Sequence, residues 1–167
     1  MRNWTLFVAL VAISLLAASC APAATPTVTQ PPLRPVLLFY YNPELDEDST
    51  GNIQCSEAGL VAVMRELPAS VEGEALIGET IRLLISGELS NEERAQGVTT
   101  EFPLEGLKLT DVRLDGGVLT LTFDDPNFRT SGGACRSGVL WAQIEQTALQ
   151  FPGVQQVRFE PESVFQP

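Results

Sequence analysis

The first 35 residues are not expected to belong to a folded domain. They contain a short apolar run that leads to a cysteine, and then a proline-rich stretch. Residues 4–16 are apolar except for Thr5 and Ser14, and this run is too short to cross a bilayer comfortably as a permanent anchor. Residues 21–35 contain five prolines and three threonines, a composition typical of a semi-extended tether. About 130 residues remain, which is a normal size for one domain.

The same N-terminal segment predicts export. Arg2 supplies a small positive charge before the apolar run, and the small residues Ala17, Ala18 and Ser19 precede Cys20. This order resembles a bacterial lipobox, in which the cysteine is lipidated and becomes the new N-terminus. Ala17 stands where a lipobox usually has leucine.

Two interpretations of this segment stay open. In the first, residues 1–19 are a lipoprotein signal peptide, Cys20 carries the lipid, and residues 20–35 form the tether. In the second, cleavage follows Ala23, because residues 21–23 fit a small-x-small site. The lipid anchor predicts a protein on the outer face of a bacterial cytoplasmic membrane, in the periplasm or at the cell surface.

The remaining segment, residues 36–165, alternates between strand and helix patterns in the order ββαββαβ. Apolar residues at 119, 121 and 123 alternate with threonines, as in a half-buried strand, whereas those at 77, 81, 84 and 85 recur at helical spacing. The expected elements are strands at 36–41 and 60–67, a helix at 72–86, strands at 107–114 and 119–123, a helix at 134–150 and a strand at 154–159. We therefore expect an α+β fold in which two helices pack on one face of a small mixed β-sheet.

Residues typical of helix caps, bulges and turns lie between these expected elements. Ser70 is a plausible N-cap for the first helix, and Ser90 and Glu93 have the spacing of a capping box that starts one short helical turn. The alternation slips near residues 110–111, which predicts a β-bulge, and residues 115–117 (Asp-Gly-Gly) predict a hairpin turn.

The charge balance excludes several classes of function. The chain has 10 basic and 21 acidic residues and no histidine, for a formal net charge of −11. Such a chain has little with which to neutralise a track of phosphates, so we expect no nucleic-acid binding. Without imidazole there is no Ser-His or Cys-His catalysis and no histidine-ligated zinc. We expect a protein that is not an enzyme and requires no cofactor.

A series of motifs along the chain resembles the GerMN domain, found in sporulation and spore-germination lipoproteins and in other bacterial envelope lipoproteins. The motifs lie at residues 37–41, 63–68, 102–109, 117–124, 146–147 and 151–157, so the resemblance covers about residues 36–160. It implies a small module resembling the ring-building modules of secretion and sporulation complexes, without a catalytic residue set. It also implies protein–protein assembly, with an envelope protein or a second copy as partner. The chain departs from the sporulation proteins in having one copy of the domain.

Two cysteines remain once Cys20 is assigned to the lipid. An even pair in an exported domain favours a disulfide between Cys55 and Cys135, which would tie the long first loop to the start of the second helix. The alternative is two free thiols, with Cys135 made reactive by the adjacent Arg136 and the helix start.

The polar loop at residues 46–57 has the ligand spacing of a calcium-binding EF-hand loop. Oxygen-bearing side chains stand at positions 1, 3, 5, 7 and 12 of this loop, and glycine stands at position 6; the candidate ligands are Asp46, Asp48, Thr50, Asn52 and Glu57. Strands are expected on both sides, whereas an EF-hand has two helices. The competing interpretation is a solvated acidic connection, so a calcium-dependent binding module is the alternative function.

The contact surface follows from the expected architecture. A sheet face turned away from the helices, or an edge strand, would be available to a partner.

Overall fold

Five strands form two separate sheets in the computed structural model, which describes residues 31–166. β1 (Leu33–Tyr41) and β2 (Leu60–Pro68) make an antiparallel pair. β3 (Lys108–Asp115), β4 (Val118–Asp124) and β5 (Gln156–Glu160) make the second sheet, in which β3 is antiparallel and β5 parallel to β4. The predicted signal peptide at 1–19, Cys20 and the tether up to residue 30 lie outside the described residues.

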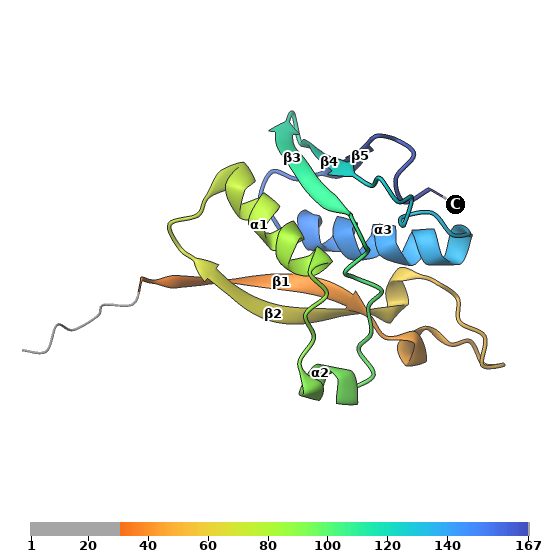
Figure 1. Cartoon of the computed structure of the whole chain (residues 1–167). Helices are drawn as coiled ribbons and strands as arrows, with labels where there is room; N and C mark the ends of the chain where they lie inside the picture. The colour runs from red at the N-terminus through yellow and green to blue at the C-terminus, as the bar shows by residue number, and fades with distance from the viewer. Residues whose placement is uncertain (1–30, 167) are drawn as a thin grey trace, which may run out of the picture. The chain divides into compact units, whose positions relative to one another are not determined.

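The α+β class and the order of elements are confirmed, but the strands do not form one sheet. α1 (Gly73–Ile85) and α3 (Ala134–Leu149) each contact strands of both sheets, so they lie between the two sheets rather than on one face of a single sheet (Figure 1). The buried residues of α1 explain this arrangement, because they span a wide arc that one sheet could not cover. They are Leu76, Ile77, Gly78, Thr80, Ile81 and Leu84.

The core fills both helix–sheet interfaces. Leu38 and Tyr40 come from β1, Leu119 and Leu121 from β4, and Ile144 from α3, and each is almost fully buried. At one end, the rings of Phe123, Phe159, Phe165 and Trp141 pack edge-on or tilted, with centroids 4.4 to 6.1 Å apart. A further short helix, α2 (Asn91–Ala95), follows α1.

Several local predictions are confirmed. In the capping box of α2, Glu93 N donates to Ser90 Oγ at 3.2 Å and Ser90 N donates to Glu93 Oε2 at 2.7 Å. The bulge falls between Leu109 and Asp111, and the hairpin after Asp115 uses two glycines with positive φ.

Several expected boundaries differ from the structure, by one to three residues; the last strand, for example, is Gln156–Glu160 rather than 154–159. The N-cap of α1 is Glu72, not Ser70, and it makes no side-chain capping bond. β1 begins at Leu33, three residues before the predicted strand, because its first residues pair with Leu67 and Pro68 at the end of β2. In residues 31–166, no helix has the length and apolar character needed to span a membrane.

Candidate functional site

A disulfide fastens the long loop between β1 and β2 to the first turn of α3. Cys55 lies in that loop and Cys135 in α3; their Cα atoms are 5.2 Å apart, and the two residues are 80 positions apart in sequence. The predicted pairing is therefore present. In the described residues, no backbone hydrogen bond joins the β1–β2 loop to α3, so the disulfide connects two segments that their backbones do not hold together.

Asp46, the first predicted calcium ligand, is turned into the protein. It is only 3 % exposed, and its carboxylate accepts hydrogen bonds from Tyr41 Oη at 2.5 Å, from Ser56 N at 2.7 Å and from Ser56 Oγ. The bonds from Ser56 and Tyr41 hold the pKa of Asp46 below its usual value. Burial, together with the bond to Asp46, raises the pKa of Tyr41 to about 12. Asp46 thus closes the loop onto the end of β1.

Asp48 organises the exposed tip of the same loop. Its carboxylate accepts from Thr50 N at 2.8 Å, Thr50 Oγ1 at 2.7 Å, Asn52 N at 3.0 Å and Gln54 Nε2 at 3.1 Å. The Asn52 amide and the Thr50 hydroxyl and amide hold the pKa of Asp48 well below its usual range. This is the hydrogen-bonding pattern of an Asx turn, in which the side chain replaces a backbone acceptor.

The Glu57 carboxylate has a partner outside the loop. Glu57 begins a short 3₁₀ turn, and its carboxylate accepts from Gln146 Nε2 of α3 at 3.4 Å. The five predicted ligands therefore divide into three separate hydrogen-bonded groups. Within residues 31–166, no three Asp, Glu, Cys or His side chains converge as a metal cluster would require.

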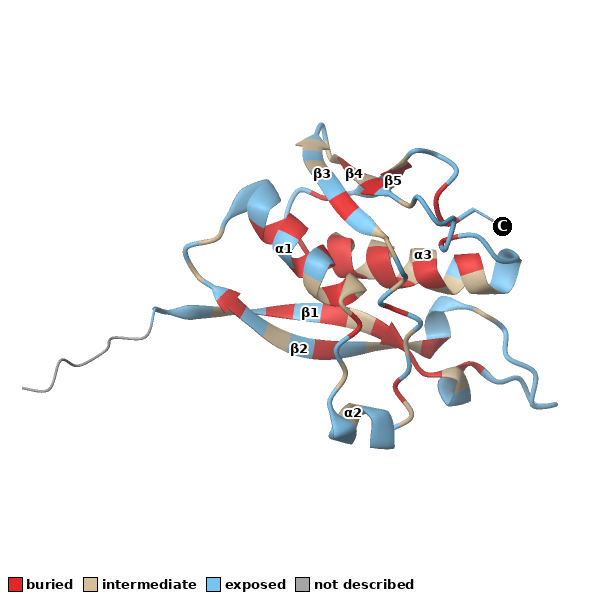
Figure 2. Ribbon diagram, viewed as in Figure 1, coloured by how far each residue is buried: buried red, intermediate tan, exposed pale blue. Residues whose placement is uncertain are grey.

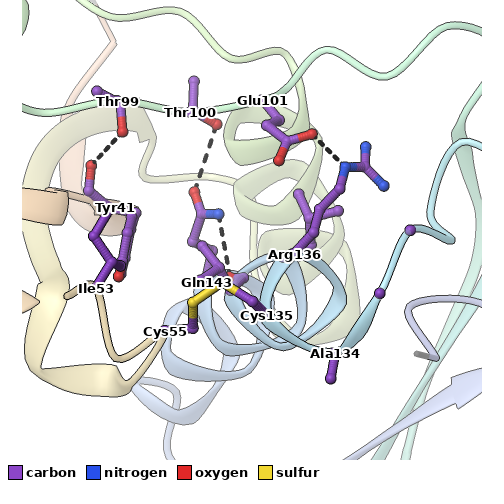
Figure 3. Close-up of a pocket in the computed structure, with 14 residues that line it drawn as sticks. Tyr41, Ile53, Cys55, Thr99, Thr100, Glu101, Ala134, Cys135, Arg136 and Gln143 are labelled. Atoms are coloured by element: carbon purple, nitrogen blue, oxygen red, sulfur yellow. Dashed lines mark hydrogen bonds and ion pairs between the residues drawn. A yellow bond between two sulfur atoms is a disulfide. The ribbon is translucent and has the colours of Figure 1, made fainter.

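A pocket of about 480 Å³ lies beside the disulfide (Figure 3). Its walls come from the end of β1, the β1–β2 loop, the segment 99–101, residues 132–133 and the first three turns of α3, and much of its lining is apolar. Arg136 Nε donates to Glu101 Oε2 at 2.6 Å at one side. Gln143 is fully buried and contacts Thr100 Oγ1 through its Oε1 at 3.5 Å.

The sequence patterns did not predict this pocket. Its residues come from segments far apart in the chain, which only tertiary contacts bring together. One signal was available, because Gln143 falls on the same helix face as Leu140, Ile144 and Thr147. A polar side chain in such an apolar stripe needs a buried partner or a cavity.

The outward side of the β1–β2 pair carries an unusual number of exposed apolar side chains. Leu33, Leu37 and Met64 are 42 %, 38 % and 64 % exposed, and Leu37 pairs directly with Met64 across the strands. We call this surface the outer face; it comprises Leu33, Pro35, Leu37, Phe39, Ala62, Met64, Glu66 and Pro68. Exposed and buried residues alternate along both strands in Figure 2, and the buried ones contact the helices.

A protein family described as Germane, sporulation and spore germination, matches residues 38–163. The structure also resembles the tandem GerMN domains of the sporulation protein GerM from Bacillus subtilis. That likeness has a TM-score of 0.53 and 22 % identity, and it covers 86 % of this chain but 44 % of that one, so this chain spans less than half of the solved chain.

A second solved structure is a candidate lipoprotein from Clostridium perfringens. It has a TM-score of 0.40 and 16 % identity, covering 79 % of this chain and 78 % of that one. The search of curated proteins gave no match. The family match covers most of the chain and confirms the GerMN-type resemblance, and the solved GerMN domains share its fold. The chain belongs to the Germane family of sporulation and spore-germination domains.

Proposed function

We propose that this protein is an exported envelope lipoprotein, anchored through Cys20, whose domain is not catalytic and binds another envelope protein. The lipobox-like sequence before Cys20 supports the anchor. The family to which the domain belongs supports a role in the envelope.

The observation that carries the binding role is the outer face of β1 and β2. Three of its side chains, Leu33, Leu37 and Met64, are among the exposed large apolar residues of residues 31–166, and Glu66 is its one charged residue. A contiguous exposed apolar patch of this kind marks a contact surface in soluble domains. A partner bound to this face would remove its apolar area from water. Each Å² removed contributes about 25 cal/mol to the free energy of binding, before the costs of association are subtracted.

Site-specific photocrosslinking in cells tests the binding role. A photoreactive residue in place of Met64 should give a covalent adduct with one partner protein. The same residue in place of Asp111, which is exposed on β3 of the other sheet, should give none. No adduct from position 64, or equal adducts from both positions, would overturn the proposal.

Charge placed on the outer face gives a second readout. With the photoreactive residue at Leu37, Met64→Glu should abolish the adduct because it desolvates a carboxylate against an apolar partner. Met64→Leu keeps the apolar contact and should retain the adduct. Both variants should fold, since Met64 is 64 % exposed.

The anchor is tested separately. Labelled palmitate should be incorporated into the full chain and lost in Cys20→Ala, while Cys55→Ser in the same assay should retain the label. A mature protein that begins at Ala24 and carries no lipid would overturn the anchor and establish cleavage after Ala23.

A further inference from the structure

The first turn of α3, which lines the pocket beside the disulfide, has no capping group. Its N-cap is Gly133, which offers no side chain, and no residue of the first turn is acidic. The backbone N–H groups of Ala134, Cys135 and Arg136 have no acceptor among residues 31–166. They give the N-terminus of this 16-residue helix a partial positive charge. This side of the pocket is therefore rich in hydrogen-bond donors.

Arg136 adds a full positive charge to the same turn. Its Nε donates to Glu101 Oε2 and its Nη1 donates to Ser131 O, both at 2.6 Å, and its Nη2 has no acceptor in the described range. Gly132 permits this placement, because a Cβ there would lie 2.9 Å from Arg136 Cδ. Glu101 is the one acidic residue among those that line the pocket. Since Arg136 neutralises Glu101, the amides of the first turn stay available to an anionic group.

Gln143 supplies a further donor, deeper in the pocket. It is only 1 % exposed, and its Nε2 donates to Val139 O at 3.2 Å. An amide nitrogen carries two hydrogens, and the second has no acceptor in the part of the chain that the structure describes. Figure 3 shows the Gln143 amide reaching from α3 toward Thr100, whose Oγ1 is 3.5 Å from Oε1. A buried donor with an unused hydrogen favours a ligand that brings an acceptor.

The two sets of donors are separated by a short stretch of helix. The bond to Val139 O places the Gln143 amide level with Val139, four residues beyond Cys135. At a rise of about 1.5 Å per residue, the donors lie about 6 Å apart along the helix axis. An extended peptide covers about 3.3–3.6 Å per residue, so this separation matches one to two residues.

The rest of the lining is largely apolar. Tyr41 comes from the end of β1, Ile53 from the β1–β2 loop, and Val139 and Leu140 from α3. The volume of about 480 Å³ is in the range of sites that enclose small ligands. Ile53 is 49 % exposed, so the rim of the pocket is apolar as well. An occupant therefore combines an anionic group, a carbonyl about one or two residues away, and apolar side chains.

We propose that this pocket binds the C-terminal end of a partner protein whose last residue is apolar. The terminal carboxylate accepts from the first-turn amides of α3 beside Arg136. A peptide carbonyl one or two residues earlier accepts from Gln143, and the last side chain packs against Val139 and Leu140. The pocket shares no residue with the outer face of β1 and β2, so this proposal does not depend on the binding role of that face.

The test is an NMR titration of the full chain in detergent micelles with an acetylated peptide of about five residues that ends in valine and leucine. The backbone amides of residues 134–136 and the side-chain amide of Gln143 should shift and saturate. The same peptide with a C-terminal carboxamide lacks the charge and should bind about tenfold more weakly. No binding at about 1 mM peptide, or equal affinity of the two peptides, would overturn the proposal.

The first turn of α1 is an internal control in the same spectra. Its N-cap Glu72 makes no side-chain capping bond either, but its first turn contains the acidic Glu74 and does not line this pocket. The amides of residues 73–75 should therefore not shift. Equal shifts in both helices would show an unspecific interaction of the peptide with helix N-termini and overturn the proposal.

Matched variants test the two polar contacts. Arg136→Gln should weaken peptide binding about tenfold, because it removes the charge beside the carboxylate. Arg129→Gln is the control: Arg129 also pairs with a glutamate, Glu105, but lies outside the pocket, and binding should not change. Gln143→Met keeps the length of the side chain without its N–H and should weaken binding roughly fivefold. Equal effects of Arg136→Gln and Arg129→Gln would contradict the site.

Filling the pocket gives a readout that does not depend on charge. Val139→Phe places a larger side chain in the pocket and should abolish peptide binding. Val118→Phe is the matched control, because Val118 is also half-buried but lies on β4, away from the pocket lining. Undiminished binding in Val139→Phe would overturn the proposal.

Two smaller probes distinguish other occupants. N-acetyl-leucine has the carboxylate, the side chain and a carbonyl but no residue to contact Ile53, so it should bind more weakly than the peptide. Equal affinity would assign the pocket to a free acylated amino acid, and equal shifts with acetate would show an adventitious ion only; either result overturns the proposal. Met64→Glu should not affect peptide binding, so failure here and failure of the outer-face proposal are distinguishable.

Discussion

The phenol of Tyr41, the last residue of β1, donates a 2.5 Å hydrogen bond to the carboxylate of Asp46. The backbone amide and hydroxyl of Ser56 donate to the same carboxylate. One buried acid therefore holds both the beginning and the end of the loop that carries Cys55. The sequence predicted this acid as a metal ligand, whereas in the structure it is an acceptor within the fold.

Removing this acceptor should loosen the loop. We expect Asp46→Ala to lower Tm more than Tyr41→Phe, because the first change leaves three donors without their acceptor and the second removes one donor. Asp48→Ala, on the exposed tip, is the control and should lower Tm less. Circular dichroism recorded during heating gives the Tm of each variant. Equal losses of Tm in Asp46→Ala and Asp48→Ala would contradict this expectation.

The same contacts predict a loss of stability in acid. The pKa of Asp46 in the folded protein lies below its ordinary value of 3.8, so the folded state favours the ionised form. This contribution is fully present above pH 3.8 and is lost as the pH falls through the lower, folded-state pKa. Unfolding experiments between about pH 5 and pH 2 should show a smaller loss of stability in Asp46→Asn than in the wild type. If the free energy of unfolding fell equally with pH in Asp46→Asn and in the wild type, Asp46 would not be the source of the acid sensitivity.

Calcium binding by residues 46–57 remains a hypothesis from the sequence, and the arrangement of its carboxylates argues against it. Calcium would have to displace Tyr41 and Ser56 from Asp46 and draw Glu57 away from Gln146. We therefore expect no change in Tm at about 1 mM calcium. A rise of several degrees that is absent in Glu57→Gln would establish the site.

The disulfide should be a major contributor to stability. Its two cysteines are separated by 80 positions, and the chain-entropy model assigns a loop of this size up to about 4.5 kcal/mol. The double variant Cys55→Ser, Cys135→Ser should lose up to this amount in denaturant unfolding, and reduced wild type should match the variant. In a Cys20→Ala background, two titratable thiols under denaturing, non-reducing conditions would contradict the disulfide.

An ion pair between β2 and α2 should also be measurable. Arg65 donates from two nitrogens to the two carboxylate oxygens of Glu93, at 2.8 and 2.9 Å, and both side chains are mostly buried. These bonds from Arg65 lower the pKa of Glu93. We expect Glu93→Gln to cost about 1–2 kcal/mol in the free energy of unfolding. Glu105→Gln breaks the exposed pair with Arg129 and should cost less than about 0.5 kcal/mol.

The predicted elements agree with the structure where the signal is local. The bulge near Leu109, the capping box of α2 and both long helices follow from residues within a few positions of one another. The predicted N-cap of α1 was wrong: Ser70 has the right side-chain chemistry, but the helix begins at Gly73, and its N-cap Glu72 makes no side-chain capping bond. The pocket had only one such signal, the polar Gln143 in the apolar stripe of α3, and the rest of its lining comes from segments far apart in the chain.

Periodicity and turn residues were enough to predict the order of elements, and the order of the motifs was enough to indicate the GerMN-type family. Cysteine parity favoured the pairing of Cys55 with Cys135, with two free thiols as the alternative, and the structure contains the disulfide. The division of the strands into two sheets, the inward turn of Asp46 and the exposure of the outer face depend instead on how the folded chain packs. These features depend on contacts between residues far apart in the chain, such as Leu37 with Gln150. Burial and edge pairing are set by which surfaces meet, and no short stretch of sequence specifies that.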